Sequence, residues 1–163
     1  MDNLKREILK LLRQNARISA REIADRLAVP VADVESRISA MEQDGTIMGY
    51  YALVNEEKLA EAKVNAIIEV QVQPERDSGF DRVATTISRF PEVRAVFLAS
   101  GGYDLLVEVV GESLQDVAFF VASKLACIEG VKGTATHFLL KKYKEAGFVL
   151  HEDEKYERLK VVP

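Results

Sequence analysis

The sequence predicts an α+β fold in two domains, and two patterns in its 163 residues support this prediction. Through residues 1–50, apolar residues recur at helical spacing in short segments separated by turns. From Val64 onward apolar and polar residues alternate, and the segments follow the order strand, helix, strand, strand, helix, strand. We therefore predict a helical domain over 1–50, a connecting strand and linker over 51–63, a mixed domain over 64–143 and a charged extension over 144–163.

The first domain is predicted to hold three helices. The first has one apolar stripe, made by Leu4, Ile8, Leu11 and Leu12. The second begins at Ser19, because Glu22 three residues later completes a capping box that satisfies free amides at a helix start. Pro30 suits the start of the third helix, which ends before Gly45. Their inward residues are Ile23, Leu27, Val34, Ile38 and Met41.

Three short helices in this order, closed by a glycine, are typical of a helix-turn-helix or winged-helix-like module whose third helix is presented to DNA. A generic three-helix bundle, whose stripes only form a core, is the alternative. The net charge of −4 argues against strong DNA binding, although residues 1–50 are neutral and the acidic excess lies in the rest of the chain. A neutral module needs several copies acting together to bind DNA well.

Composition excludes several classes of protein. Hydrophobic residues make up 48% and charged residues 29%, as in ordinary globular proteins. No apolar run reaches the roughly 18 residues of a membrane span, and the N-terminus lacks a signal-peptide pattern, so we expect a cytoplasmic protein without membrane contact. Cys127 is the single cysteine, and His137 and His151 are far apart, so we expect no disulfide, no metal and no cofactor.

The second domain is predicted to begin, after a connecting strand at 49–54, with a strand from Val64 that Pro74 ends. Ser78 caps a helix that Pro91 stops, with Phe80, Val83, Ile87 and Phe90 inward. Strands at 93–99 and 103–110 follow. Ser113 then caps a helix that Gly130 closes, and a last strand lies within 131–143. The apolar stripe of that helix is Leu114, Val117, Val121, Leu125 and Ile128.

This order predicts a ferredoxin-like βαββαβ domain, an antiparallel sheet with helices on one face. The other face needs cover, which self-association would supply. We expect an apolar patch there, made by Ile67, Leu106, Val110, Phe138 and Leu140.

The segment between the two middle strands has the composition of a ligand-binding turn. Gly101 and Gly102 let backbone amides approach a ligand closely, and Asp104 offers negative charge to an ammonium, which suits an α-amino acid. The alternative is that the glycines only make a tight hairpin.

With these patterns, the chain resembles the Lrp/AsnC family of bacterial and archaeal regulators, also called leucine-responsive or feast/famine proteins, from residue 2 to about 143. The matching segments are 4–17 with its Asn-Ala-Arg turn, Glu22-Ile23-Ala24, 37–47, Gly49-Tyr50, 101–106, Gly130-Val131 and 134–136. The resemblance implies an N-terminal DNA-binding domain, a C-terminal effector domain, homodimers that assemble into tetramers or octamers, and amino acids or related small molecules as effectors.

By position, the resemblance implies that helix 31–43 reads DNA and that the effector lies where dimers meet. The chain departs from the family at Pro30, where a phosphate-contacting serine is usual, and Asp33 and Glu35 are unfavourable near phosphates. The implied DNA contacts are Arg17, Ser19, Ala32, Asp33, Ser36 and Arg37. The implied effector contacts are Ser100, Gly101, Gly102, Tyr103 and Asp104, with Thr134 and Thr136, unless these threonines only fill the pleated sheet.

We therefore predict a sequence-specific transcriptional regulator, not an enzyme, that binds double-stranded DNA and responds to an amino acid or related molecule. Two alternatives stay open: a sirohaem decarboxylase-like subunit, which would need clustered cationic donors around its ligand, and an amino-acid sensor acting through protein partners. We predict no catalytic residue. The extension 144–163 is compatible with disorder or with a hairpin paired to a neighbouring subunit.

Overall fold

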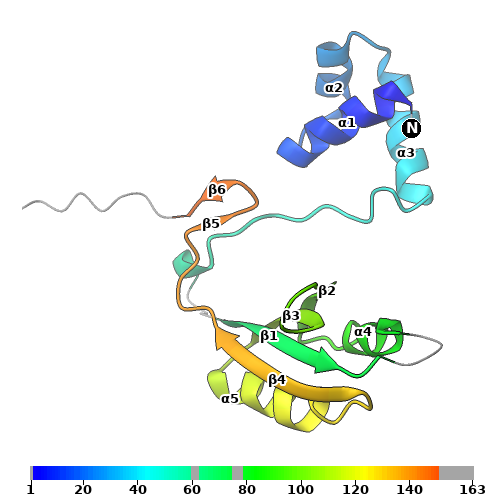
Figure 1. Cartoon of the computed structure of the whole chain (residues 1–163). Coiled ribbons are helices and arrows are strands. Elements are labelled where there is room, and N and C mark those ends of the chain that lie inside the picture. The colour runs from blue at the N-terminus through cyan, green and yellow to red at the C-terminus, as the bar shows by residue number, and fades with distance from the viewer. Residues whose placement is uncertain (1, 60–62, 75–78, 151–163) are drawn as a thin grey trace, which may run out of the picture. The chain divides into compact units, whose positions relative to one another are not determined.

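The chain divides into two compact units, residues 1–53 and 54–163, in the computed structural model, which describes residues 2–59, 63–74 and 79–150. The first unit is helical, and the second is built on an antiparallel sheet (Figure 1). Each unit has its own buried apolar cluster. The α+β fold predicted from the sequence is therefore confirmed.

The first unit contains the three predicted helices, α1 (Asn3–Gln14), α2 (Ala20–Leu27) and α3 (Val31–Gln43). Asp2, Ser19 and Pro30 are their N-cap residues. The predicted starts at Ser19 and Pro30 are thus confirmed. The apolar faces of the three helices meet in one core, formed by Ile8, Leu12, Ile18, Ile23, Ala24, Val34 and Met41.

The strand predicted at 49–54 is absent from the structure, which has irregular backbone there, followed by a short 3₁₀ helix, η1 (Glu56–Lys58). The physical reason is that a strand exists only through hydrogen bonds to a neighbouring strand, and no second segment of the described chain pairs with this backbone. Tyr50 instead donates a hydrogen bond of 2.9 Å from its hydroxyl to Glu42 Oε1.

The second unit follows the predicted order. Its main elements are β1 (Val64–Val72), α4 (Asp81–Ile87), β2 (Val93–Leu98), β3 (Leu105–Gly111), α5 (Leu114–Phe120) with the π-helical turn η2 (Val121–Leu125), and β4 (Val131–Phe138). The four strands form one sheet in the order β2-β3-β1-β4, and every neighbouring pair is antiparallel. This topology is the predicted ferredoxin-like arrangement.

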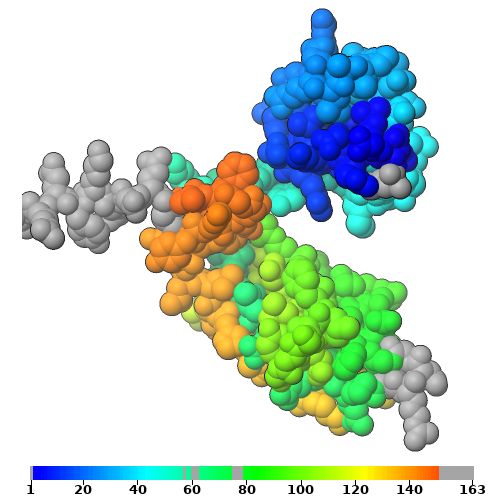
Figure 2. Space-filling view, turned by 45° about the horizontal axis from the view of Figure 1, so that its top comes forward, coloured from blue at the N-terminus to red at the C-terminus, as the bar shows by residue number. Residues whose placement is uncertain are grey.

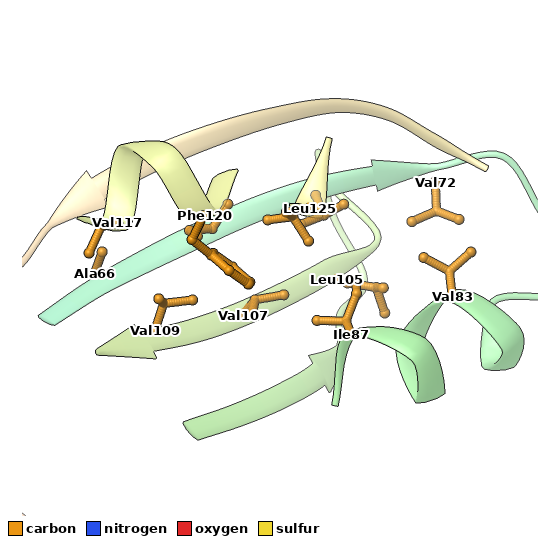
Figure 3. Packing of buried hydrophobic residues seen from close by; sticks show 12 residues of the cluster. Ala66, Val72, Val83, Ile87, Leu105, Val107, Val109, Val117, Phe120 and Leu125 are labelled. Atoms are coloured by element: carbon orange, nitrogen blue, oxygen red, sulfur yellow. The ribbon is translucent and has the colours of Figure 1, made fainter. Parts of the chain in front are cut away.

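Both helices cover one face of this sheet, and the side chains between them fill the core (Figure 3). Alternate residues of β1 point into this layer, because successive side chains of a strand face opposite sides. The rings of Phe90 and Phe120 meet edge to face there, with centroids 5.5 Å apart. The buried residues are Ala66, Ile68, Val70, Val72, Val83, Ile87, Leu105, Val107, Val109, Val117, Phe120 and Leu125.

The apolar stripe predicted for the second helix of this unit is partly wrong. Leu114 is 52% exposed, whereas Phe120, absent from the predicted stripe, is buried. The cause is the π-helical turn, in which Ala126 N–H donates to the carbonyl oxygen of Val121, five residues back. This wider turn brings Phe120 and Leu125 to the same face, whereas a regular helix would separate them.

The first helix of the second unit also differs from the prediction at its ends. Ser78, the predicted cap, lies outside the described residues, and the observed N-cap of α4 is Phe80. The helix ends at Ile87, before Pro91. Phe90 N–H donates to the carbonyl oxygen of Ile87, three residues back, so the chain tightens and leaves the helix earlier than the proline requires.

Two residues predicted on the uncovered face lie elsewhere. Phe138 is paired directly with Ala66, so it shares the helix-covered face, because cross-strand partners point to the same side. Leu140 follows the end of β4 and is 95% exposed. The uncovered face therefore includes Ile67, Leu106, Val110, Phe97 and Ala135, interrupted by Glu69, Gln71, Glu108 and His137.

The extension forms a small hairpin, β5 (Lys144–Glu145) and β6 (Phe148–Val149), before residue 151, where the description ends. Ala146 and Gly147 turn the chain, both with positive φ. Phe148 and Val149 are exposed, and this part of the extension is drawn in orange in Figure 2. Within the described residues, no helix has the length and apolar character that crossing a bilayer requires.

Candidate functional site

Local sequence determines where α2 and α3 begin. Glu22 N–H donates to Ser19 Oγ at 3.1 Å, while Ser19 N–H donates to Glu22 Oε2 at 2.9 Å, which is a complete capping box. The hydrogen bonds that the Glu22 carboxylate accepts from the backbone N–H and the hydroxyl of Ser19 hold the pKa of Glu22 below its ordinary value. Ala28 then adopts the left-handed conformation, with φ of 53°, and redirects the chain into Pro30 and α3.

One side of α3 is exposed. Val34 and Met41 face the core of the first unit and are fully buried. The exposed residues of the helix include Ala32, Asp33, Glu35, Ser36 and Ser39. The exposed side of the helix is polar and carries three carboxylates, those of Asp33, Glu35 and Glu42, so any attraction to phosphate must come from other parts of the unit.

Cations lie on the neighbouring helices and turns. Five arginines of the first unit are exposed, and none forms an ion pair with another described residue. Guanidinium groups that keep all their donors suit phosphate oxygens. The five are Arg6, Arg13, Arg17, Arg21 and Arg26.

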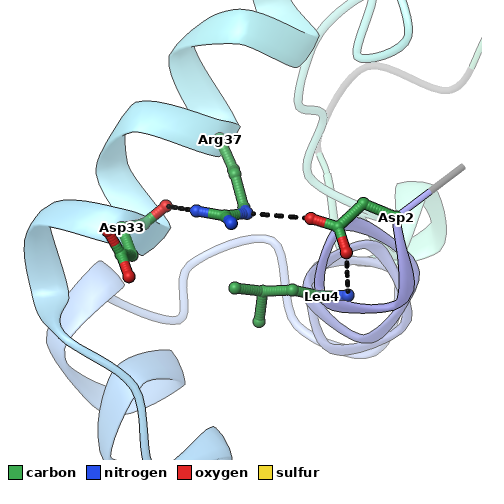
Figure 4. Close-up of polar contacts among 4 residues, drawn as sticks. All are labelled: Asp2, Leu4, Asp33 and Arg37. Carbon is green, nitrogen blue, oxygen red and sulfur yellow. Dashed lines mark hydrogen bonds and ion pairs between the residues drawn. The ribbon is translucent and has the colours of Figure 1, made fainter.

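Arg37, the only basic residue of α3, is already engaged. Its Nε donates to Asp2 Oδ2 at 3.2 Å, and its Nη1 donates to the carbonyl oxygen of Asp33 at 3.2 Å (Figure 4). The other carboxylate oxygen of Asp2 accepts from Leu4 N–H at 3.3 Å and so caps α1. The hydrogen bond from Arg37 is the main reason that the pKa of Asp2 lies below its ordinary value.

The predicted DNA contacts thus fall into distinct groups. Arg17 is exposed in the turn before α2, and Ala32, Asp33 and Ser36 are exposed on α3. The hydroxyl of Ser19 is occupied by Glu22, to which it also donates at 2.8 Å.

The turn between β2 and β3 is fastened to the end of β1. Asp104 Oδ2 accepts a hydrogen bond of 2.7 Å from Val72 N–H, and Asp104 N–H donates to the carbonyl oxygen of Val70 at 3.0 Å. Ser100, Gly101 and Gly102 are exposed beside it, and Tyr103 is partly buried. Gly101 has φ of +154°, a conformation that other residues rarely adopt.

The two threonines of β4 are separated from this turn by β1. Thr134 pairs with Val70 and Thr136 with Ile68, so both share the helix-covered face and are partly buried there. β1 lies between them and β3, so two strand spacings, about 10 Å, separate Thr134 from the start of β3. Within one chain, the structure brings the five turn residues together but does not bring the threonines into contact with them.

Gln71 is a residue of this region that the sequence reasoning missed. It lies on the uncovered face, and its Nε2 donates to the carbonyl oxygen of Gly102 at 3.4 Å. Its cross-strand partner is Gly133, where an added Cβ would lie 3.4 Å from Gln71 Oε1. The side chain of Gln71 therefore lies between Gly102 and Gly133. The only sequence signal for this role was the position of Gln71 on the polar side of the first strand of the domain.

A separate hollow of about 200 Å³ lies at the opposite end of β1, lined in part by Val54, Lys63, Leu139 and Leu150. Its charged groups have partners within the chain, for example Lys142 Nζ and Glu145 Oε2 at 2.7 Å. Among the described residues, no cluster of histidine, cysteine and carboxylate side chains is suited to hold a metal ion.

Comparison with known proteins gives the context for these two regions. A family model described as winged helix-turn-helix DNA-binding matches residues 1–48, and one described as the Lrp/AsnC ligand binding domain matches residues 65–148. The HTH-type transcriptional regulator YugG of Bacillus subtilis is 42% identical over 158 residues, which is 96% of this chain and 95% of that protein. The Bkd operon transcriptional regulator of Pseudomonas aeruginosa is 28% identical over 86% of this chain and 92% of its own.

Solved structures agree with these sequence matches. A Neisseria meningitidis transcriptional regulator in complex with L-methionine is 26% identical, with a TM-score of 0.69 over 89% of this chain and 93% of its own. Escherichia coli AsnC has the same fold, with 24% identity and a TM-score of 0.67 over 89% of this chain and 95% of its own. This chain therefore belongs to the Lrp/AsnC family of transcriptional regulators, with a DNA-binding helix-turn-helix domain followed by a ligand-binding domain.

Proposed function

We propose that the protein binds specific DNA sequences through α3 and that an amino acid bound near the turn at 100–104 modulates this binding or the assembly of subunits. The observation that carries the DNA part is the exposed face of α3, which no residue of the first unit's core covers. Ala32, Ser36 and Ser39 are small, so the helix can approach the edges of the bases closely. Exposed Arg17 and Arg21 supply phosphate contacts.

The amino-acid part of the proposal is supported by the polar groups around the turn. An α-amino acid needs an anionic or carbonyl acceptor for its ammonium and amide donors for its carboxylate. Asp104 keeps acceptor capacity beyond the hydrogen bond from Val72, and the backbone at Gly101 and Gly102 is unshielded by side chains. The Neisseria relative that binds L-methionine makes an amino acid the first effector class to test.

We further propose that a second copy of the chain covers the free face of the sheet, giving homodimers that assemble into tetramers or octamers. Phe97 is 51% exposed, and Ile67, Leu106 and Val110 are only partly buried, so association would remove these apolar side chains from water. Thr134 and Thr136 would then reach an effector bound at the turn only where subunits meet. Light scattering should give the mass of a multimer, and Leu106→Lys should lower that mass.

The experiment that tests the regulator function is binding of the purified protein to a labelled fragment of its own upstream region. The fragment is titrated at several salt concentrations, with and without a pool of amino acids. We expect tight, salt-sensitive binding that one amino acid shifts. Arg17→Ala should weaken binding to every DNA sequence and reduce the slope of log K against log salt by about 1. Binding no tighter than to random DNA would contradict the proposal.

A further inference from the structure

The contact between Asp2 and Arg37 joins two parts of the first unit that have different tasks. Asp2 precedes α1, whereas Arg37 belongs to α3, the helix that the proposed function presents to DNA. The guanidinium Nε and Asp2 Oδ2 are 3.2 Å apart, and the pair is open to water, since the side chains are 31% and 50% exposed. An exposed pair of this kind can be opened by another anion.

The position of Arg37 on α3 indicates that the competing anion is a DNA phosphate. Each residue advances the helix by about 100°, so Arg37 lies about 60° from buried Val34 and about 100° from Ser36 on the exposed face. Arg37 therefore lies on the flank of the helix. From a flank, a long cationic side chain meets the DNA backbone on the rim of the groove, and phosphate oxygens are the group it meets there.

The charge of Asp2 persists under the conditions in which DNA is bound. The hydrogen bond from Arg37 holds the pKa of the Asp2 carboxyl below its ordinary value of 3.8, so the group is anionic at neutral pH. Its two oxygens are divided between two tasks, because Oδ1 caps α1 and Oδ2 holds Arg37. The cap and the ion pair can thus be separated by substitution.

We propose that Asp2 is an internal competitor of DNA phosphate at Arg37, so that its carboxylate lowers the DNA affinity of the free protein. When DNA binds, a phosphate replaces the Asp2 carboxylate as the partner of the Arg37 guanidinium. The negative charge of Asp2 then remains close to the phosphates and repels them. The inference rests on DNA binding through α3. It assigns a role in recognition to a residue outside the recognition helix.

The decisive variant is Asp2→Asn. Asparagine caps helices as well as aspartate does and keeps an acceptor for Leu4 N–H, but it carries no charge for Arg37. An exposed ion pair is worth little, so releasing Arg37 should tighten DNA binding by about two- to fivefold. The slope of log K against log salt should steepen by up to about 1, because Arg37 then reaches phosphate without leaving a partner.

Asp44→Asn is the matched control. Asp44 also accepts a local hydrogen bond, from Thr46 N–H at 2.9 Å, and its replacement changes the net charge of the chain equally. Asp44 is the C-cap residue of α3 and does not bind Arg37. A general charge effect on DNA binding would therefore appear in both variants, whereas competition at Arg37 would appear only in Asp2→Asn. In an Arg37→Ala background, Asp2→Asn should lose its effect on affinity and on salt slope.

Three results would overturn the inference: unchanged binding in Asp2→Asn, equal tightening in Asp44→Asn, or weaker binding in Asp2→Asn with an unchanged melting temperature. The last would mean that Asp2 positions Arg37 for DNA. These failures are distinct from failure of the proposed function, in which the wild-type protein itself shows no salt-sensitive binding and Arg17→Ala changes nothing.

Discussion

Asp104 and Val72 lock the turn at 100–104 to the sheet, because the carboxylate of Asp104 accepts the backbone N–H of Val72 at 2.7 Å. The same residue donates its own N–H to Val70, so both ends of this contact extend the pairing of β1 with β3. A residue expected from the sequence to bind an ammonium therefore also has a structural task. Substitution can separate the two.

Asp104→Ala should destabilise the second unit by about 1–3 kcal/mol, because Val72 N–H loses its partner. Asp104→Asn keeps an acceptor and should cost less, yet it should weaken amino-acid binding at least about tenfold if the carboxylate pairs with the ammonium. Urea unfolding and calorimetric titration measure the two effects. If Asp104→Asn binds the amino acid as tightly as the wild type, the carboxylate does not pair with the ammonium and Asp104 has only a structural role.

Gln71→Ala should weaken binding of the effector by about three- to tenfold, with little change in stability. The reason is that its side-chain amide, which contacts Gly102, is the polar group between the turn and Gly133 on the open face. Gln115→Ala makes the same chemical change at an exposed position of α5 and should leave binding unchanged. Equal losses in the two variants would exclude a specific role for Gln71.

Ala28→Gly should stabilise the first unit by about 0.5–1 kcal/mol. Ala28 has φ of 53° and ψ of 47°, which is the left-handed conformation. This conformation strains alanine through its Cβ, whereas glycine adopts it freely. Ala40→Gly, on the exposed side of α3, should instead destabilise by about 1 kcal/mol. Thermal unfolding followed by circular dichroism compares them, and a loss of stability in Ala28→Gly would contradict the argument.

Acid should weaken the second unit through Glu92. The hydrogen bond from Lys124, which also lies 5.8 Å from the centroid of the Phe90 ring, holds the pKa of Glu92 below its ordinary value of 4.5 despite burial. A carboxyl with a lowered folded pKa stabilises the fold above its unfolded pKa, and this contribution is lost as pH falls through the folded value.

Glu92→Gln should therefore be less stable than the wild type at neutral pH, and the difference should shrink as the pH falls below 4.5. Chemical unfolding at a series of pH values measures this convergence. A constant difference would mean that the glutamate acts through packing and not through charge. Glu129→Gln, which removes an ion pair with Arg82 that is open to water, is the control for the loss of one surface charge and its ion pair.

The parts of the fold predicted from the sequence are those determined by neighbours in the chain. The capping box at Ser19 and Glu22 spans three residues, and the start of α3 at Pro30 follows from the fixed φ of proline. The order of strands and helices followed from the change of period at Val64. Each of these signals lies within a few consecutive residues, so these elements could be predicted without knowledge of tertiary contacts.

The features that escaped prediction depend on distant partners or on small changes of register. Arg37 and Asp2 are 35 residues apart, and Gln71 and Gly102 are 31 apart, so no local pattern connects them. The π-helical turn after Phe120 shifts the buried side of the helix without any glycine or proline to mark it. The predicted position of Phe138 on the uncovered face was wrong. The face on which a strand residue lies depends on the register with the partner strand, and this register cannot be read from the strand's own sequence.

The two apolar clusters described above have no residue in common within the described chain. Because cooperativity in unfolding comes from shared packing, each unit should lose its structure in a transition of its own. Substitutions on the exposed face of α3 then leave the sheet intact, and changes around the turn at 100–104 leave the helices intact. Natural variation can thus change the surface of one unit without unfolding the other.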